Sequence, residues 1–224
     1  MVDKDPNSAD FAVLIPIRSF FDGKTRIRSV GSNLKAELVK EAAAGVVDAA
    51  RSYPTFVVTS ENNVKGWAQN QKCDVIDGGA ANLNEDLGSA CSALAARDYR
   101  RVAIALGDVP LLRADDIAES LAAQGAYLIT DVKRRGTNLL AIDLPIPITL
   151  SFGPNSRALH CEQVIELGIA LRVIEESFAC FDLDTPGDIL ALKELRATKS
   201  EQLRPQELDK LEQLFRAAER LSGT

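Results

Sequence analysis

Two aspartates, Asp182 and Asp184, flank a leucine in the segment FDLDTP, which closes an apolar run of the sequence. Alternation with a period of two would place both carboxylates on one face of an extended chain, with Phe181 and Leu183 on the other. Like charges this close repel each other unless a cation lies between them. Mg²⁺ prefers oxygen ligands, usually one or two carboxylates with phosphates and waters. The spacing therefore indicates a metal site, with Asp108 of LGDVPLL as a third candidate ligand.

Cations and glycine-rich turns accompany these acids. The segment IPIRSFFDGKTRI supplies Arg18, Lys24 and Arg26. The segment SFGPNS brings Gly153 and Ser156 to an expected helix start, where free backbone N–H groups attract anions. Such a mixture suits nucleotidyl transfer, in which an acceptor phosphate attacks the α-phosphorus of a nucleoside triphosphate and pyrophosphate leaves. This reaction needs positioning and charge neutralisation more than covalent work by the protein.

Short apolar strands alternate with amphipathic helices along most of the chain. The expected strands are residues 11–17, 55–60, 73–76, 101–106, 126–130, 138–143 and 171–175. The expected helices are residues 33–52, 61–71, 82–98, 113–125, 155–168 and 204–222. This alternation predicts an α/β fold with a doubly wound parallel sheet. Because ligands collect at the carboxyl ends of such strands, Arg18 and Asp108, which follow their strands closely, are expected there.

Composition limits the setting of the protein. With 224 residues, 46% of them hydrophobic, the chain is long enough for one sizeable core. A net charge of -6 without a basic stripe argues against a nucleic-acid partner. No apolar run approaches the ~20 residues that span a membrane, and the polar N-terminus does not resemble a secretory signal, so a cytoplasmic protein is expected. The four cysteines and the single histidine lack zinc-site spacing, and the cysteines are expected to be small buried thiols.

Each motif alone has a structural alternative. Asp184 could cap a helix that begins at Pro186, and LGDVPLL could be a turn that closes a strand. The cations after the first strand could form a solvated loop, and FGPNS could be an ordinary turn. His160 could make a structural hydrogen bond or contact a ligand. The order of the motifs, at the ends of successive strands, favours the chemical interpretation over these alternatives.

The ordered segments IPIRSFFDGKTRI, LGDVPLL, RRGTNLLAI, FGPNSRALH and FDLDTP resemble the 2-phospho-L-lactate / phosphoenolpyruvate guanylyltransferases of coenzyme F-420 biosynthesis. The resemblance covers about residues 11–195, and its most specific part is G-T-N followed by F-G-P-x-S-x-x-x-H and D-x-D-T-P. It implies a single-domain, Rossmann-like nucleotidyltransferase fold akin to molybdenum-cofactor guanylyltransferases, with a mostly parallel mixed sheet flanked by helices on both faces. It also implies Mg²⁺, GTP as substrate, and transfer to a small phosphorylated acid with release of pyrophosphate.

The resemblance implies three groups of site residues. The metal ligands would be Asp108, Asp182 and Asp184. The catalytic residues would be Asp108, Lys24 and Arg26, the two cations lying near the triphosphate. The acceptor would be held by Thr137, Gly153 and Ser156. Three further candidates for substrate binding are His160, which lies in the matching motif, and Arg18 and Arg157, at which this chain departs from the usual pattern of the family. The carboxylate of the acceptor could be bound by Arg157 or by a neighbouring backbone amide.

The expected acceptor is a three-carbon phosphoacid, with phosphoenolpyruvate ahead of 2-phospho-L-lactate and 3-phosphoglycerate. One alternative is a transferase of the same fold that acts on a sugar phosphate or a molybdopterin-type acceptor, but the opening L-x-G-G-x-S-x-R-M-G of such relatives is absent. The other is a non-catalytic nucleotide-binding protein, against which the retained aspartates argue. The expected organisation is a flexible N-terminus (1–10), a nucleotidyltransferase domain (11–198) and a C-terminal helical extension (199–224). The expected partners are small-molecule substrates, and a homodimer stays open.

Overall fold

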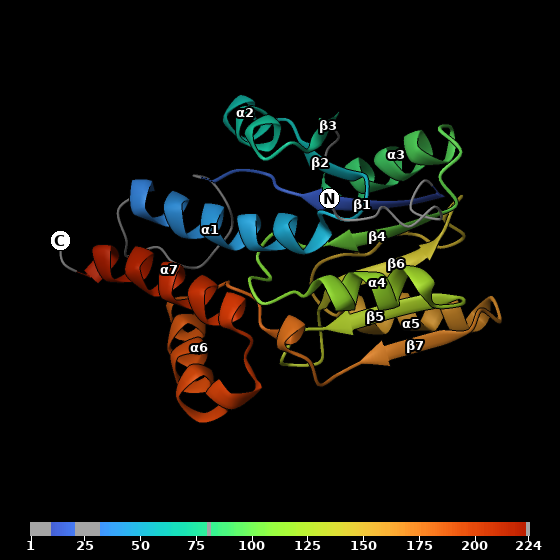
Figure 1. The fold of residues 1–224 in the computed structure, drawn as a ribbon. Coiled ribbons are helices and arrows are strands. Elements are labelled where there is room, and N and C mark those ends of the chain that lie inside the picture. The colour runs from blue at the N-terminus through green and yellow to red at the C-terminus, as the bar shows by residue number, and fades with distance from the viewer. Residues whose placement is uncertain (1–9, 21–31, 80–81, 223–224) are drawn as a thin grey trace.

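The centre of the protein is one sheet of seven strands. The computed structural model describes residues 10–20, 32–79 and 82–222. The strand order is β3-β2-β1-β4-β6-β5-β7 (Figure 1). The strands are β1 (Phe11–Pro16), β2 (Thr55–Thr59), β3 (Asp74–Asp77), β4 (Arg101–Ala105), β5 (Ala126–Thr130), β6 (Thr137–Asp143) and β7 (Leu171–Ile174). In the described chain β6 alone runs against its neighbours, so the sheet is mixed and mostly parallel, as expected from the motifs.

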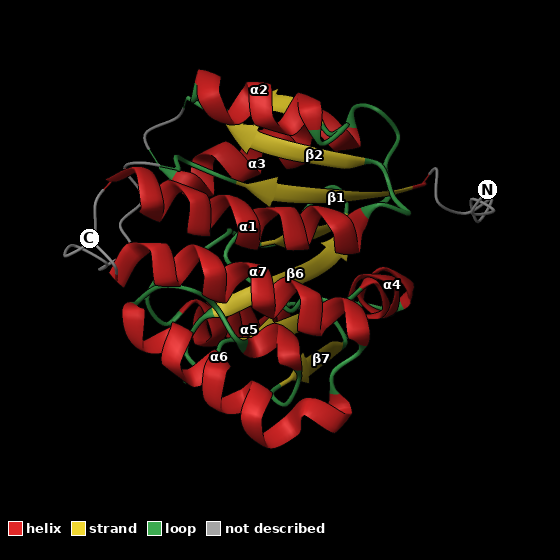
Figure 2. Cartoon of the chain, turned by 60° about the vertical axis from the view of Figure 1, so that its left-hand side comes forward, coloured by secondary structure: helices red, strands yellow, loops and turns green. Residues whose placement is uncertain are grey.

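Helices cover both faces of this sheet. They are α1 (Ser32–Ala50), α2 (Asn62–Asn70), α3 (Leu83–Ala95), α4 (Ala114–Ala122), α5 (Ser156–Glu166), α6 (Pro186–Lys199) and α7 (Pro205–Ser222). Two 3-10 turns, η2 (Phe178–Cys180) and η3 (Ser200–Gln202), flank α6. Helices α1, α2 and α4 pack on one face and α3 and α5 on the other (Figure 2). None of the helices in the described ranges is sufficiently long and apolar to cross a membrane.

Burial on both faces explains why the strands read as uninterrupted apolar runs. Within β1, Val13 and Ile15 pack towards α1, whereas Ala12 and Leu14 pack towards α3. All four side chains are fully buried. A strand covered on both sides needs apolar residues at every position, so its sequence loses the usual polar alternation.

The antiparallel strand β6 lies between β4 and β5, to which it connects through the short loop 131–136. The Asp131 carboxylate closes this loop by accepting hydrogen bonds from the backbone N–H groups of Arg135 (2.6 Å) and Gly136 (2.8 Å). Because β6 runs backwards, its first residue, Thr137, lies beside the carboxyl ends of β4 and β5. The reversal thus places the start of one strand at the edge where the other six end.

The C-terminal helix α7 packs along α1 and α6 (Figure 1). Leu211, Leu214 and Phe215 are buried in a cluster with Leu38 of α1 and Leu192 of α6. Helix α6 begins at Pro186, where the sequence offered a helix start only as the structural alternative for Asp184. Residues 1–9, most of the expected flexible N-terminus, lie outside the described residues.

Candidate active site

Six strands end on the same side of the sheet, and the arrowheads of β4, β5 and β7 point the same way in Figure 1. The strand order reverses between β1 and β4, which pair with each other and have their next strands on opposite sides. The chain beyond β4 passes close to the end of β1, since a Cβ atom on Gly107 would lie 3.2 Å from Cγ1 of Ile17. Asp108 follows directly. It therefore lies at the reversal point, where sheets of this kind bind their ligands.

Asp108 carries a carboxylate oxygen, Oδ1, that is buried and has no hydrogen-bond partner among the described residues. Burial, together with the nearby charges of Asp184 and Asp182, raises the pKa of this carboxyl to about 7. A buried polar atom without a partner is costly, and a buried charge more so. The site is therefore one that a cation would stabilise.

Asp182 and Asp184 reach Asp108 on a segment that is extended but is not a strand of the sheet. A backbone hydrogen bond from the Leu183 N–H to the Asp108 carbonyl (2.9 Å) fixes this segment in place of a strand ladder. Leu183 is buried in the cluster beneath α6 and α7, whereas Asp184 is exposed. Burial raises the pKa of Asp182 to about 6, with the Asp184 charge as the next cause.

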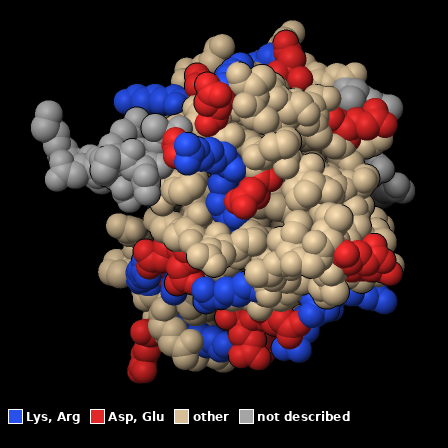
Figure 3. All heavy atoms as spheres, turned by 90° about the vertical axis from the view of Figure 1, so that its right-hand side faces the viewer, with Lys and Arg blue, Asp and Glu red and all other residues tan. Residues whose placement is uncertain are grey.

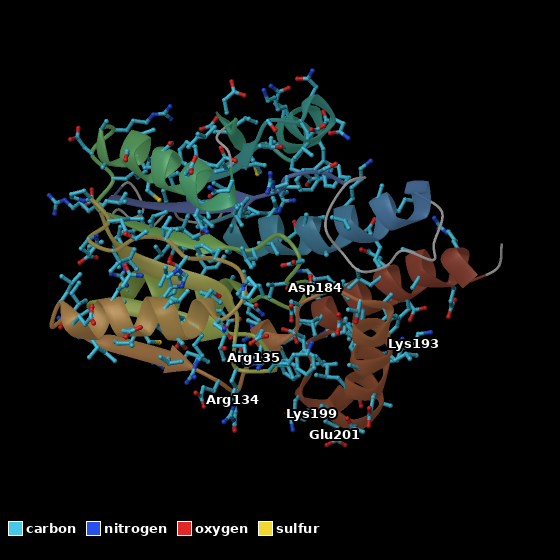
Figure 4. All side chains as sticks on the ribbon, turned by 180° about the vertical axis from the view of Figure 1, so that it is seen from behind. Arg134, Arg135, Asp184, Lys193, Lys199 and Glu201 are labelled. Atoms are coloured by element: carbon cyan, nitrogen blue, oxygen red, sulfur yellow. The ribbon has the colours of Figure 1, made fainter. Side chains whose placement is uncertain are left out.

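The alternative in which Asp184 caps the following helix is wrong. Thr185 is the N-cap of α6. The Asp188 carboxylate accepts hydrogen bonds from the backbone N–H groups of Asp184 (2.9 Å) and Thr185 (2.6 Å) and from the Thr185 hydroxyl (2.9 Å). The N-cap is therefore Thr185, one residue after Asp184, and Asp184 lies between the sheet and the α6–α7 pair in Figure 4.

The acidic centre is open rather than preassembled. Within the described ranges, no three His, Cys, Asp or Glu side chains converge closely enough to form a metal site by themselves. The three aspartates nevertheless lie within electrostatic reach of one another. Carboxylate oxygens, one of them buried without a partner, suit a hard cation such as Mg²⁺. They fit an ion that completes its shell with phosphates and water, and not a closed protein site.

Two loops on the other side of the centre meet at His160. Its Nε2 atom accepts a hydrogen bond from the Ser151 backbone N–H (2.9 Å), and its Nδ1 atom lies 3.1 Å from the Thr137 hydroxyl. Because Nε2 accepts, the neutral ring carries its proton on Nδ1 and donates it to Thr137. The ring is fully buried, and burial lowers its pKa to about 4. His160 is therefore a neutral link between the two loops.

Gly153 and Ser156 lie at the start of α5, as expected. Gly153 has a φ of +131°, a conformation that favours glycine, and a Cβ atom there would meet nothing within 4 Å. Ser156 is buried. The N–H groups of Ser156 and Arg157 already donate to the carbonyls of Gly153 and Arg135, so fewer amides are free for an anion than the sequence suggested.

The cations expected at the site are distributed unevenly. Arg157 forms an ion pair with Glu175, which also pairs with Arg134 at 3.1 Å, so the Arg157 guanidinium is drawn to the end of β7. Arg18 is exposed just beyond β1. Lys24 and Arg26 lie outside the described residues.

Two contributions were not foreseen from the sequence. Asn84 on α3 makes two hydrogen bonds with the backbone of Phe152, at 2.7 and 3.1 Å. These residues are 68 positions apart, so no local pattern could reveal the contact. Arg135 belongs to the quoted segment RRGTN but was not singled out. Its backbone is fixed at both the N–H and the carbonyl, and Figure 4 shows it between Arg134 and Asp184.

Two hollows on the surface lie away from the acidic centre. One, of about 410 Å³, lies between α3 and the loop 145–150, and another, of about 450 Å³, lies between α6 and α7. Neither is lined by the three aspartates. The opposite edge of the sheet, shown in Figure 3, has acidic and basic side chains interspersed rather than a patch of one sign. The carboxyl edge therefore remains the candidate site on chemical grounds.

Comparisons with known proteins agree with the geometry. Residues 11–202 match the sequence model of the family described as "Guanylyl transferase CofC like". The chain is 28% identical to a phosphoenolpyruvate guanylyltransferase of Chloroflexus aggregans, over 77% of this chain and 91% of that protein. It is 30% identical to a protein of the same name from Mycobacterium sp. (strain KMS), over 85% and 89%. It is 28% identical to a 3-phospho-D-glycerate guanylyltransferase of Phenylobacterium zucineum, over 78% and 86%.

Solved structures support the fold. A protein of Desulfovibrio desulfuricans G20, provisionally assigned as a nucleotide-diphospho-sugar transferase, aligns with a TM-score of 0.71 at 13% identity, covering 92% of this chain and 97% of that chain. A 4-diphosphocytidyl-2C-methyl-D-erythritol synthase aligns with a TM-score of 0.58 at 12% identity, over 83% and 97%. The expected nucleotidyltransferase fold is confirmed. With a family match that spans nearly the whole sheet and its helices, the chain belongs to the Guanylyl transferase CofC like family.

Proposed function

We propose that the protein transfers the guanylyl group of GTP to a small phosphorylated three-carbon acid and releases pyrophosphate. The observation that carries this proposal is the Oδ1 atom of Asp108, which is buried at the reversal point of the sheet, has no hydrogen-bond partner in the described part of the chain and lies within electrostatic reach of two further aspartates. The family match and the printed names of the relatives supply the guanylyl donor and the class of acceptor.

The reaction is a substitution at phosphorus. A phosphate oxygen of the acceptor forms a bond to the α-phosphorus of GTP, the bond from that phosphorus to the bridging β-phosphate oxygen breaks, and pyrophosphate leaves. The product is a guanosine diphosphate adduct of the acid. No side-chain nucleophile is needed, so the work of the protein is to hold two highly charged substrates in line.

Asp108, Asp182 and Asp184 are the residues that would hold Mg²⁺. A bound Mg²⁺ neutralises charge on the phosphates and acts as a Lewis acid at the reacting phosphoryl group. The carboxylates themselves contribute fixed negative charge. Their relative position is held by the hydrogen bond from the Leu183 backbone N–H to the Asp108 carbonyl. This link keeps the acids of two distant segments in a constant arrangement.

The acceptor would lie between the loop that precedes β6 and the start of α5. Thr137, Gly153 and Ser156 would hold its phosphate, and His160 would support them. The carboxylate of the acid requires a cation. Arg157 was expected in this role, but it is already paired with Glu175. Arg135 forms no ion pair among the described residues and lies on the loop that leads directly to Thr137, so we propose it as a second candidate.

The triphosphate of GTP would lie against the first loop. Arg18 is exposed at that edge, and Lys24 and Arg26 follow it in the sequence. Changing Lys24 or Arg26 to alanine should weaken GTP binding more than acceptor binding, because a triphosphate carries the larger charge. Calorimetry with GTP alone measures this directly. Unchanged GTP affinity in both variants would mean that this loop is a solvated surface loop without a role in GTP binding.

The proposed function is tested by incubating the protein with GTP, Mg²⁺ and each of three acids: phosphoenolpyruvate, 2-phospho-L-lactate and 3-phosphoglycerate. Product mass identifies the adduct, and pyrophosphate release gives the rate. We expect turnover with at least one acid, phosphoenolpyruvate first. Glucose 1-phosphate and mannose 1-phosphate serve as controls. Turnover with a sugar phosphate but with none of the acids would overturn the assignment.

We further propose a cytoplasmic location and a protein that works without nucleic acid. The net charge of -6 supports the second statement, because a nucleic acid would be repelled. A homodimer remains a proposal that light scattering of the purified protein would test. We also propose that the nucleotidyltransferase domain comprises residues 11–198 and that residues 199–224 form a C-terminal extension.

A further inference from the structure

The segment that leads into α5 is held by side chains instead of by a strand ladder. It leaves β6 at Asp143, at the amino edge of the sheet, and returns to the carboxyl edge at Gly153. Gln163 anchors the middle of this segment, since its side-chain amide accepts from Thr149 N–H (2.8 Å) and donates to the Thr149 carbonyl (3.0 Å). We refer to residues 149–153 as the return loop.

His160 anchors the next position of the return loop. Its Nε2 atom accepts from Ser151 N–H, and its ring packs edge-on against Phe152 with ring centroids 5.0 Å apart. The other ring nitrogen is engaged by Thr137. Since the ring is fully buried and both nitrogens are occupied, His160 has no group left for a direct contact with substrate.

Asn84 anchors the last residue before Gly153. Its side-chain oxygen accepts from Phe152 N–H (2.7 Å), and its side-chain nitrogen donates to the Phe152 carbonyl (3.1 Å). Asn84 is fixed in turn, because its backbone N–H donates to the side chain of Asn82, the N-cap of α3 (3.0 Å). The anchor therefore extends from the half of the sheet that contains β1, β2 and β3 to the start of α5.

We propose that Asn84 and His160 are positioning residues, which set the place of Gly153 and Ser156 relative to Thr137 and thereby the place of the acceptor phosphate. The reason is geometric. A segment without strand pairing has no backbone register, so its position along the sheet depends on the side chains that hold it. Misplacing a reacting group by about 1 Å can lower a rate by on the order of 10²-fold. This inference rests on the proposed function for its kinetic part.

The first test is kinetic. His160→Phe keeps an aromatic ring against Phe152 but removes both hydrogen bonds, and Asn84→Leu removes both bonds to the Phe152 backbone. Each variant should raise KM for the phosphoacid on the order of 10-fold or more and leave KM for GTP unchanged. His160→Gln has an amide that can accept from Ser151 and donate to Thr137, so it should recover part of the loss.

The matched control is Val164→Ala. Val164 lies one turn from His160 on α5 and is also fully buried, in the same apolar cluster as Leu150 and Phe152, but among the described residues it makes no hydrogen bond to the return loop. This variant should lower thermal stability without raising KM for the acid. If it raises KM as much as His160→Phe does, or if His160→Phe raises KM for GTP equally, the two residues are merely structural and the proposal fails.

The second test needs no substrate. Hydrogen exchange of the free protein should show the Ser151 and Phe152 amides protected in the wild type, with protection lost in His160→Phe and Asn84→Leu but kept in Val164→Ala. Protection unchanged in the first two variants would overturn the proposal even if the wild type transferred no guanylyl group. If the two variants lose protection but the wild type itself transfers no guanylyl group, the anchoring of the return loop is supported and only the proposed reaction is refuted.

Discussion

At the scale of single residues, Asp108 has a buried carboxylate oxygen whose hydrogen-bonding capacity is not satisfied by the described residues, and it lies at the reversal point of the sheet. Its Oδ1 atom is buried without a described partner, and two further aspartates act on it. Such an arrangement lowers the stability of the ligand-free protein, and it is typical of sites where a ligand supplies the missing positive charge. The same residue should therefore affect stability and activity in opposite directions.

Asp108→Asn should lower guanylyl transfer by on the order of 10²-fold or more, because an amide cannot supply the anionic ligand. In the absence of metal its melting temperature should match or exceed that of the wild type, since a buried, repelled charge is gone. Mg²⁺ should raise the wild-type melting temperature but not that of the variant. Asp48→Asn is the control, because Asp48 forms an exposed ion pair with Arg51 at the end of α1. Near-normal turnover in Asp108→Asn, Asp182→Asn and Asp184→Asn would exclude the metal site.

Arg135 and Arg157 can be separated experimentally because their surroundings differ. Arg135→Gln should raise KM for the phosphoacid on the order of 10-fold, by removal of a charge-assisted hydrogen bond to its carboxylate. Arg157→Gln should act mainly on stability, because it breaks the pair with Glu175. Steady-state kinetics and thermal unfolding of both variants distinguish the two roles. The reverse pattern would assign the carboxylate to Arg157.

Helix α5 illustrates what an element contributes to the site. Its first turn brings Ser156 beside the loop that precedes β6, and its second turn carries His160 into the space between that loop and the return loop. The imidazole is fully buried and shielded from water, and its pKa is lowered to about 4. Docking of the helix is therefore coupled to the protonation of one side chain.

The free energy of unfolding should fall as the pH drops from about 6.5 to about 4. In this range the unfolded chain binds a proton at His160 and the folded chain does not, so acid favours unfolding; above about 6.5 the contribution is complete. A pKa lowered from 6.5 to about 4 corresponds to about 3 kcal/mol. Denaturant unfolding of the wild type and of His160→Gln at several pH values isolates this contribution, since other groups titrate in both. Parallel curves for the two proteins would disprove the coupling.

The whole molecule is completed by α7, which packs alongside α1 and α6. Lys210 donates to the carbonyl of Gly45 (3.1 Å), and Glu207 pairs with Arg113 at the start of α4 (2.7 Å). The apolar cluster beneath α7 also contains Leu183, the residue between the two aspartates of the site. The C-terminal helices thus help to hold the segment that carries Asp182 and Asp184, because Leu183 packs in the same cluster.

Leu211→Ala should reduce the free energy of unfolding by about 2–4 kcal/mol, because Leu211 is fully buried in this cluster. Leu190→Ala is the matched control, since Leu190 on α6 is 68% exposed and its truncation should cost less than about 0.5 kcal/mol. Chemical denaturation measures both. Equal stability of the two variants would mean that α7 contributes little to the fold.

The sequence alone determined the strands, most helices and the chemical types at the carboxyl edge. Apolar runs such as residues 101–105 and 126–130 predict their own burial, because hydrophobic periodicity is a local property of the chain. The motifs LGDVPLL and FDLDTP also indicated the family, since an ordered set of short segments keeps its meaning without coordinates.

Only the tertiary structure decided how these segments meet. It placed Leu183 on the Asp108 backbone without a strand, gave the helix cap to Thr185, and joined Asn84 to Phe152 across 68 residues. The physical reason is that hydrogen bonds between distant segments depend on strand order and on the direction of β6. Neither of these is written in the periodicity of any one segment.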